Sequence, residues 1–449
     1  MKQDTRTILK GGHVIDPVNG VDGPADVLID GGLLVMVGPD LPIEAGTTVV
    51  EVPPGCIVCP GFIDMHVHLR EPGHEHKETV ATGVAAAVAG GFTAVACMPN
   101  TDPVNDDAGI TRLILSKAEQ AGLARVYPIG AVTKGSAGEH LAEIGELRAA
   151  GCVAVSDDGH PVASALLMRR ALEYAAMFDM PVIDHCEDRS LAGDGVANEG
   201  YHAAVLGLSG MPAAAEEVIV ERDVTLSGLT RSPVHIAHVS TRGALRAVRS
   251  GKTRGIPVSC EVTPHHFTLT DERLAGYDTN YKMNPPLRET ADVEAMLEGL
   301  RDGSIDCIAT DHAPHHYDEK LAEFDRAPLG VVGLETAVSI CLDRLVHRGL
   351  LSVGRLVELL SVNPARILGV PGNGLAAGAP ADITVLAPDL AVTVEAQAFR
   401  SLGRNTPFDG WSLRGGVAAT VVGGRAVYVN EAVTGATAFH SLRASRVAT

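Results

Sequence analysis

Both ends of the chain alternate short apolar runs with turn residues. Near the start, apolar runs at residues 7–9, 25–29 and 34–37 are separated by Gly-Gly pairs, a spacing typical of β-hairpins. The same pattern returns at residues 381–386 and 419–428. Because these β-rich ends flank a long middle with a different pattern, we expect the termini to meet in one small β-sandwich domain. The predicted domain comprises residues 1–58 and 372–449.

Between these ends the pattern changes to short apolar segments separated by alanine-rich stretches. This alternation indicates strands of a parallel sheet joined by helices. Eight strands are expected to end near Val67, Met98, Val132, Ser156, Asp184, Ala237, Val262 and Ala309. Eight such units over roughly 300 residues suit one closed barrel. We therefore predict an α/β protein with a TIM-like (β/α)8 barrel over residues 59–371, from which the Gly-, Ala- and Pro-rich residues 370–380 lead back to the sandwich.

An uncharged stretch, residues 82–100, is long enough to be considered as a membrane span. It contains Gly83, Gly90 and Gly91 and ends in the turn-like pair Pro99-Asn100, which favours a buried helix followed by a buried strand. The first residues also lack the apolar core of a signal peptide. We therefore expect a cytoplasmic protein that does not enter a membrane.

The composition narrows the classes of partner. A formal net charge of −19 argues against nucleic acid and against an anionic membrane surface, because both attract basic patches. Only 4% of the residues are aromatic, so the core must consist mainly of Val, Ile, Leu and Ala. The eight cysteines are scattered, as expected of buried free thiols. Cys56 and Cys59 form a C-x-x-C pair, but no second pair follows at the spacing of a zinc ribbon.

Polar side chains follow nearly every predicted strand of the barrel. Active sites of such barrels lie at the carboxyl ends of the strands, so these residues are candidates for the chemistry. In strand order they are His66, His68 and Arg70; Asn100; Thr133 and Lys134; Asp157 and Asp158; His185; His238; His265 and His266; and Asp311 and His312.

The H-x-H pair at the end of the first strand is the strongest single signal of a metal. Side chains two residues apart on a strand point the same way, so His66 and His68 can reach one cation. In this context His185 and His238 are candidate ligands as well. Asp311 ends a buried apolar run, where an unpaired carboxylate would be costly and a metal or catalytic partner is the simplest explanation.

Imidazoles and carboxylates without a cysteine suit zinc and also admit other divalent metals. Four histidines with two aspartates exceed one tetrahedral shell, which indicates two ions about 3.5–4 Å apart. The sequence therefore predicts a hydrolase with one or two Zn²⁺ ions that activate water.

At these residues the chain resembles the amidohydrolase superfamily and, within it, the bacterial class I dihydroorotases. The resemblance spans nearly the whole chain. The matching segments are residues 61–73 (GFIDMHVHLREPG), 76–79 (HKET), 98–101 (MPNT), 284–288 (NPPLR) and 311–315 (DHAPH). It implies the reversible, zinc-dependent cyclisation of N-carbamoyl-L-aspartate to L-dihydroorotate in pyrimidine biosynthesis.

The resemblance also implies roles for individual residues. One metal would be held by His66, His68, Asp158 and Asp311, and a second by Asp158, His185 and His238. Asp311 would act as general acid and base. The substrate would contact Arg70, Asn100, Asn284 and His315, with Leu329 and Gly330 on the far side.

Two positions need comment within this resemblance. Many superfamily members carry a carboxylated lysine after the fourth strand, where this chain has Asp157 and Asp158. The choice between these two aspartates depends on the register of the strand, because neighbouring residues face opposite sides. Leu329 stands where the family more often has phenylalanine.

Two other functions compete with this interpretation. Hydantoinases and allantoinases act on cyclic amides without a ring carboxylate, so they leave no anion for Arg70 to bind. An inactive scaffold subunit of the same fold is the other alternative, although every ligand position is filled here. The resemblance further implies a homodimer and an association with aspartate carbamoyltransferase.

Overall fold

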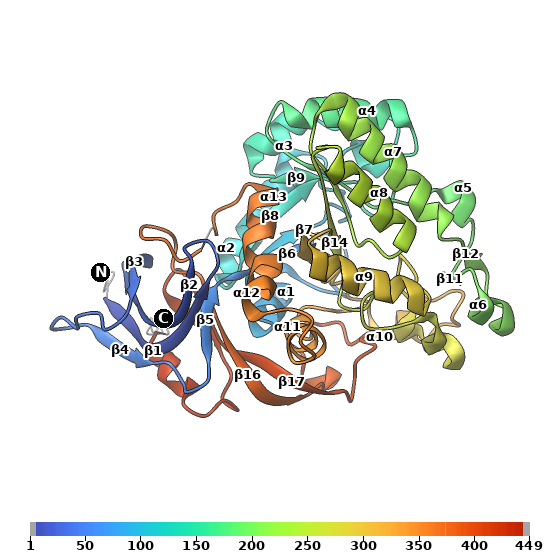
Figure 1. Ribbon diagram of the computed structural model, residues 1–449. Helices are drawn as coiled ribbons and strands as arrows, with labels where there is room; N and C mark the ends of the chain where they lie inside the picture. Colours follow the sequence, from blue (N-terminus) through green and yellow to red (C-terminus); the bar gives the residue numbers. More distant parts are fainter. Residues whose placement is uncertain (1–5, 373, 443–449) are drawn as a thin grey trace.

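The computed structural model describes residues 6–372 and 374–442. Within these residues, eight parallel strands follow one another around a barrel in chain order, with helices outside them (Figure 1). The strands are β6 (Phe62–Val67), β7 (Phe92–Cys97), β8 (Arg125–Gly130), β9 (Ala154–Val155), β10 (Val182–Asp184), β13 (Val234–Ile236), β14 (Val258–Val262) and β15 (Cys307–Ile308). A parallel bridge between Val67 and His312 joins the last segment to the first, so the predicted barrel is confirmed.

The helices between the barrel strands lie outside the barrel, and some of the short ones extend away from it at the right of the view (Figure 1). They are α1 (Val80–Ala89), α2 (Ala108–Ala121), α3 (Ile144–Ala150), α4 (Ala165–Ala176), α5 (Arg189–Ala192), α6 (Tyr201–Leu206), α7 (Ala214–Thr230), α8 (Arg242–Thr253), α9 (Thr290–Asp302), α10 (Tyr317–Lys320), α11 (Ala337–Cys341), α12 (Val353–Val357) and α13 (Asn363–Leu368). The two-residue strands β11 (Ala197–Asn198) and β12 (Gly210–Met211) pair beside α6.

The uncharged stretch over residues 82–100 forms most of helix α1 followed by strand β7, as predicted. Thr79 caps α1 by accepting from the backbone N–H of Thr82, and every residue of β7 is buried. Among the described residues, no helix combines the length and the apolar character that crossing a membrane requires.

Strand β8 ends at Gly130, two residues before the predicted end at Val132. The backbone N–H groups of Val132 and Thr133 donate to Asp157 Oδ1, at 2.8 and 3.0 Å. The Asp157 carboxylate thus accepts the hydrogen bonds that the backbone of a neighbouring strand would otherwise accept. The strand therefore ends and the chain turns away from the sheet here.

Strands from both ends of the chain form one mixed sheet, in which β16 lies between β5 and β17 (Figure 1). The strands are β1 (Thr7–Asp16), β2 (Val21–Asp30), β3 (Leu33–Gly38), β4 (Thr48–Glu51), β5 (Ile57–Pro60), β16 (Ile383–Thr393), β17 (Ser412–Val422) and β18 (Arg425–Val429). Hydrogen bonds link all eight into a single sheet. Strand β5 crosses the boundary predicted at residue 58, and the division into two domains stays a prediction.

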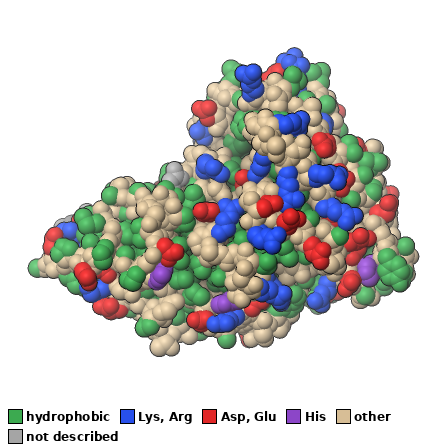
Figure 2. Space-filling view, in the orientation of Figure 1, with side chains coloured by type: hydrophobic (Ala, Val, Ile, Leu, Met, Phe, Trp, Pro, Cys, Tyr) green, Lys and Arg blue, Asp and Glu red, His purple; other side chains and the backbone are tan. Residues whose placement is uncertain are grey.

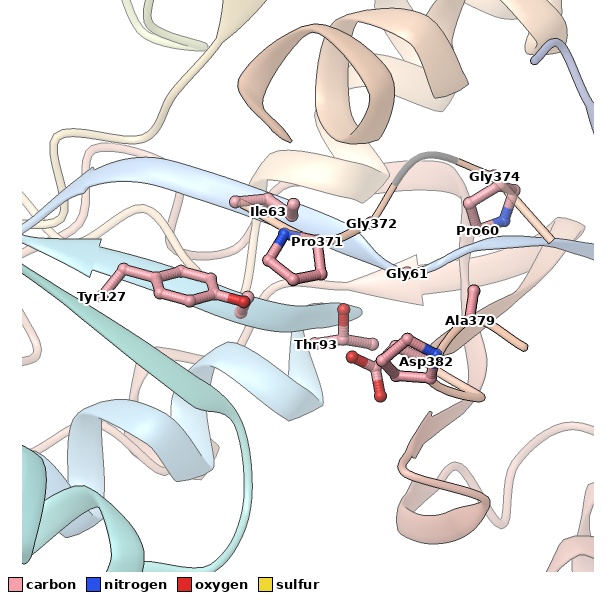
Figure 3. Close-up of a pocket in the computed structure, with 12 residues that line it drawn as sticks. Pro60, Gly61, Ile63, Thr93, Tyr127, Pro371, Gly372, Gly374, Ala379 and Asp382 are labelled. Atoms are coloured by element: carbon pink, nitrogen blue, oxygen red, sulfur yellow. The ribbon is translucent and has the colours of Figure 1, made fainter. Parts of the chain in front are cut away.

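The terminal sheet closes the amino end of the barrel strands. Thr384 donates to the carbonyl of Gly91 at 2.7 Å, and Arg125 forms a two-pronged ion pair with Asp382 at 2.6 and 3.1 Å. A cavity of about 20 Å³ lies between the two parts, lined by Thr93, Pro371 and neighbouring residues (Figure 3). A space of this size holds about one water, so this cavity is too small for an organic substrate.

The surface charges and the cysteines can be compared with the expectations from the sequence. Figure 2 shows Lys and Arg side chains gathered over α8 and α9, with Asp and Glu side chains among them, while the net charge of the chain is −19. All eight cysteines are free and buried, as predicted. Burial raises the pKa of Cys56 to about 11, which favours an inert thiol there.

Candidate metal centre and active site

The H-x-H pair ends the first barrel strand, where both side chains point into the carboxyl end of the barrel. His66 Nε2 lies 3.4 Å from Asp158 and 3.5 Å from Asp311. His68 Nε2 lies 3.5 Å from Asp158 and 3.0 Å from Asp311. Strands one, four and eight therefore bring two imidazoles and two carboxylates to one point.

Strands five and six add the remaining two histidines. His185 Nδ1 and His238 Nε2 lie 2.9 Å apart, and each is 3.8 Å from the same oxygen of Asp158. The six residues predicted as metal ligands thus lie together, with Asp158 at the centre of the group, and each of them is buried.

The donor atoms in this cluster fit a cation. Two of them, His66 Nε2 and Asp158 Oδ1, are buried and have no hydrogen-bond partner among the described residues. Potential ligand atoms of His66, His68 and Asp311 lie within 4.8 Å of one another, as do those of His66, Asp158 and His238. Buried polar atoms without partners are rare and costly, whereas a metal ion at this point would satisfy both of these atoms.

The charges of the cluster also suit a metal. Burial alone would raise the pKa of Asp158, but the neighbouring histidines His66, His238 and His68 hold it well below its ordinary value. The pKa of Asp311 is likewise lowered, because the bond to His68 and the charge of His66 outweigh burial. Both aspartates are therefore ionised at neutral pH and available as ligands.

The two aspartates after the fourth strand have different surroundings. Asp157 accepts from the backbone N–H groups of Val132 and Thr133 and from the hydroxyl of Thr133. Asp158 faces the histidines instead. The structure thus brings Asp158, and not Asp157, to the candidate centre.

Glu261, in β14, is a residue of the site that the sequence did not single out. It is fully buried and accepts from Nδ1 of His66 at 2.7 Å, leaving Nε2 of that ring for the centre. It also accepts from His235 at 3.2 Å. A carboxylate behind a metal-binding histidine fixes the orientation of the ring and increases its basicity. A single acidic residue inside the apolar run 258–262 could have drawn attention to it.

Arg70 and Asn100 lie beside the histidine pair. Arg70 Nε donates to the carbonyl of Pro314 at 3.2 Å, and no carboxylate of the described residues lies within ion-pair distance of it. Glu71, a possible partner on the loop, pairs with Lys117. Asn100 Oδ1 lies 2.9 Å from His68 Nδ1, so Asn100 also holds a ring of the pair.

The other predicted substrate contacts, Asn284, His315, Leu329 and Gly330, lie on segments joined by hydrogen bonds, such as that from the N–H of Gly330 to the carbonyl of Lys282 at 3.0 Å. We call these four residues the wall. Asn284 donates to Glu187 at 2.7 Å, while its Oδ1 is buried and has no hydrogen-bond partner in the part of the chain that the structure describes. His315 Nε2 donates to the carbonyl of Leu329 at 2.8 Å. Gly330 has φ +125°, and a Cβ there would lie 2.7 Å from that of Ala313, so the wall needs glycine at this point. A cavity of about 420 Å³ lies beside this wall and is lined in part by His315.

Several side chains of the site stand on a strained backbone. Arg70, His238 and Asp311 have φ values of +62°, +31° and +48°. Such conformations are unfavourable for residues other than glycine and cluster at functional sites. The backbone strain at Arg70, His238 and Asp311 is therefore consistent with a functional role for these three strand ends.

Comparison with known proteins gives relatives of nearly full length. Residues 55–244 match the protein family described as Dihydro-orotase-like. Over 421 residues the chain is 53% identical to the dihydroorotase of Geobacter metallireducens, which covers 94% of this chain and 99% of that protein. It is 56% identical over 422 residues to the dihydroorotase of Anaeromyxobacter dehalogenans, covering 94% and 97%.

Solved structures share the fold. The L-hydantoinase (dihydropyrimidinase) of Arthrobacter aurescens superposes with a TM-score of 0.84 at 24% identity, covering 94% of this chain and 96% of that one. The D-hydantoinase (dihydropyrimidinase) of a Thermus species gives 0.79 at 26% identity, covering 95% and 96%. The barrel with its terminal sheet is therefore an architecture found in solved enzymes, at much lower identity than the sequence relatives.

Proposed function

The chain belongs to the dihydroorotase family, and we propose that its histidine–aspartate centre interconverts N-carbamoyl-L-aspartate and L-dihydroorotate in de novo pyrimidine (UMP) biosynthesis. The single observation that carries this assignment is 53% identity to a dihydroorotase over 94% of the chain. The site geometry supports it, because buried ligands from five different strands meet at the carboxyl end of the barrel.

We propose Zn²⁺ as the metal, one or two ions per chain. His66, His68, Asp158 and Asp311 would hold one ion, and Asp158, His185 and His238 would hold the second. When bound, the metal would polarise the ring carbonyl and lower the pKa of water enough to supply hydroxide near neutral pH. Nitrogen and carboxylate donors without sulfur support zinc while admitting other divalent ions.

Asp311 is the proposed proton carrier. In the hydrolytic direction its ionised carboxylate accepts the proton of the attacking water and then donates it to the ring nitrogen as the amide C–N bond breaks. In the cyclising direction the same carboxylate takes the proton from the ureido nitrogen and returns it to the departing oxygen. The lowered pKa of Asp311 keeps the carboxylate ionised, which is the state that the first of these steps requires.

The substrate would be held by its carboxylate and its ring. Arg70 has no carboxylate partner among the described residues and carries a charge that can bind the substrate carboxylate through a two-pronged bond, with Asn100 beside it. The free Oδ1 of Asn284 can accept from a ring N–H. His315, Leu329 and Gly330 would line the far side.

The decisive experiment measures turnover of dihydroorotate by ultraviolet absorbance on protein of known metal content. The same preparation is offered hydantoin and dihydrouracil, which lack the carboxylate. Turnover of dihydroorotate alone supports the proposal. Equal turnover of all three would favour a hydantoinase, and no turnover by metal-loaded protein would favour the inactive scaffold.

We further propose a cytoplasmic homodimer that associates with aspartate carbamoyltransferase. Eight free thiols support a reducing compartment, and the partner enzyme would supply the substrate. Sedimentation of the chain alone and with aspartate carbamoyltransferase tests both assemblies.

A further inference from the structure

We propose that Asn405, which lies in the connection between β16 and β17 and not in the barrel, is a positioning residue that fixes the substrate-binding wall. The inference rests on the proposed function, because His315 and Gly330 are assigned there to the substrate. It gives the terminal part of the chain a role in the reaction beyond closing the barrel.

The side chain of Asn405 bonds three backbone groups of the wall. Its Oδ1 accepts from the N–H of His315 at 3.1 Å. Its Nδ2 donates to the carbonyls of Ala313 at 3.0 Å and Gly330 at 3.1 Å. One side chain thus links the loop after β15, at residues 313–315, to the segment that contains Gly330.

The backbone of Asn405 strengthens the same link, because its carbonyl accepts from the N–H of Val332 at 2.9 Å. The side chain is only 4% exposed, so water does not replace these bonds. An amide is the group that can accept at one end and donate two hydrogens at the other, which is what the three backbone groups require.

The segment that carries Asn405 is anchored to the barrel just before it. The backbone N–H groups of Arg400 and Ser401 donate to Glu335, at 2.8 and 3.2 Å. The hydroxyl of Ser401 and the N–H of Leu402 donate to the buried Glu78. These contacts fix the path of the connection over the active-site end of the barrel.

A close backbone approach follows the anchors. A Cβ at Gly403 would lie 2.7 Å from Pro314 Cβ and 2.8 Å from Val332 Cγ1, so glycine is needed for this contact. Pro314 lies between the two residues of the loop that Asn405 bonds. The segment that carries Asn405 therefore packs directly against residues 313–315, the loop that it positions.

Loss of the Asn405 amide would leave more unpaired backbone groups in residues 313–315 than at Gly330. The carbonyl of Gly330 also accepts from Lys320 at 3.0 Å and would keep a partner. The carbonyl of Ala313 and the N–H of His315 would lose the bonds that Asn405 supplies. His315 would then be less well placed against the substrate, which should appear mainly in the KM for dihydroorotate.

The test uses two variants of the full, metal-loaded chain. Asn405→Ala removes all three bonds. Asn405→Asp keeps the shape and the acceptor for His315, but its ionised second oxygen faces two carbonyls and cannot donate. We expect each variant to raise the KM for dihydroorotate about tenfold or more, since misplacement by about 1 Å can cost 100-fold. The metal content should equal that of wild type, and kcat should change less than KM.

Asn430 supplies the matched control. It directly follows β18, donates to Val417 at 3.1 Å and accepts from the N–H of Ala432 at 3.1 Å, so it has the same amide chemistry beside the terminal sheet. Asn430→Asp should leave the KM unchanged. A KM within twofold of wild type for both Asn405 variants would overturn the proposal, as would an equal rise for Asn430→Asp.

Hydrogen–deuterium exchange gives a readout that does not depend on turnover. In Asn405→Asp, amides of residues 313–332 should exchange faster than in wild type, while those of residues 144–176 should not change. Unchanged exchange over residues 313–332 would refute the positioning role. If wild type fails to convert dihydroorotate, the proposed function is wrong, and the exchange experiment still decides whether Asn405 holds this loop.

Discussion

Replacing Glu261 by glutamine should weaken the affinity of the centre for zinc about tenfold, through the histidine that it holds. Glu261 accepts from His66 Nδ1 at 2.7 Å, from His235 Nε2 at 3.2 Å and from the N–H of His238 at 3.3 Å. Two of the three donors belong to residues proposed as metal ligands. The carboxylate therefore acts on the metal without touching it.

The size of the effect follows from what glutamine can replace. Its carbonyl can keep the bonds from His66 and His238. Its amide can face His235 if that ring moves its proton to Nδ1, where the hydroxyl of Ser259 lies 2.8 Å away. Shape and hydrogen bonding survive, and only the charge is lost. A hydrogen bond to a charged group contributes about 1.5–3 kcal/mol and a neutral one about 0.5–1.5. The difference of about 1–1.5 kcal/mol corresponds to about tenfold in affinity.

Competition between the metal-free protein and a coloured chelator measures this affinity directly. Glu335→Gln is the control, because Glu335 accepts from Arg400 and Ser401 and bonds no histidine. The reasoning is refuted if Glu261→Gln binds zinc within twofold of wild type, or if Glu335→Gln weakens binding as much.

Four further results are expected. Asp311→Ala should lower kcat by about 10²–10⁴-fold with a smaller effect on KM; a variant that keeps more than about a tenth of kcat would show that another group carries the proton. Arg70→Lys should raise the KM for dihydroorotate, because lysine lacks the planar fork, whereas Arg70→Met should not slow any residual turnover of dihydrouracil. Zinc alone should restore activity to metal-free protein in buffer without carbon dioxide, because Asp158 needs no carboxylation to bind metal; a need for bicarbonate would point to a modified lysine. Burial and the charge of Lys282 lower the pKa of Lys320 from 10.5 to about 7. Between these values the unfolded chain retains a proton that the folded chain has released, so the free energy of unfolding should rise with pH. Denaturant titrations of wild type and Lys320→Met should differ in this slope, and equal slopes would contradict the assignment.

Much of the proposed ligand set could be predicted from sequence because it depends on local rules. The two-residue period places His66 and His68 on one side of a strand, and barrel topology places residues after each strand at one end. Their convergence around Asp158 follows from these rules. The choice between Asp157 and Asp158 did not, because it depends on which carboxylate meets the N–H groups of Val132 and Thr133, a contact between different βα units.

The residues that hold the ligands in place could not be predicted in this way. Glu261 and His66 are separated by 195 positions, and Asn405 and His315 by 90. No periodic pattern connects such pairs. A charge within an apolar strand marks Glu261 as unusual, but its partner is defined only by the closed barrel. Asn405 lies in an irregular connection, where polar residues are common and carry no signal.

The position of the centre also bears on how the barrel closes. Between β15 and β6 the described backbone has the single parallel bridge of Val67 with His312, with the N–H of His68 donating to His312 at 2.9 Å, in place of a full ladder. His66 and His68 lie at the end of β6, on one side of this junction, and Asp311 follows β15, on the other side. A cation held by these three side chains would therefore cross-link the first and last strands at a place where the backbone ladder is short. Because metal bound only to the folded chain stabilises it, the same ion would serve catalysis and the closure of the barrel.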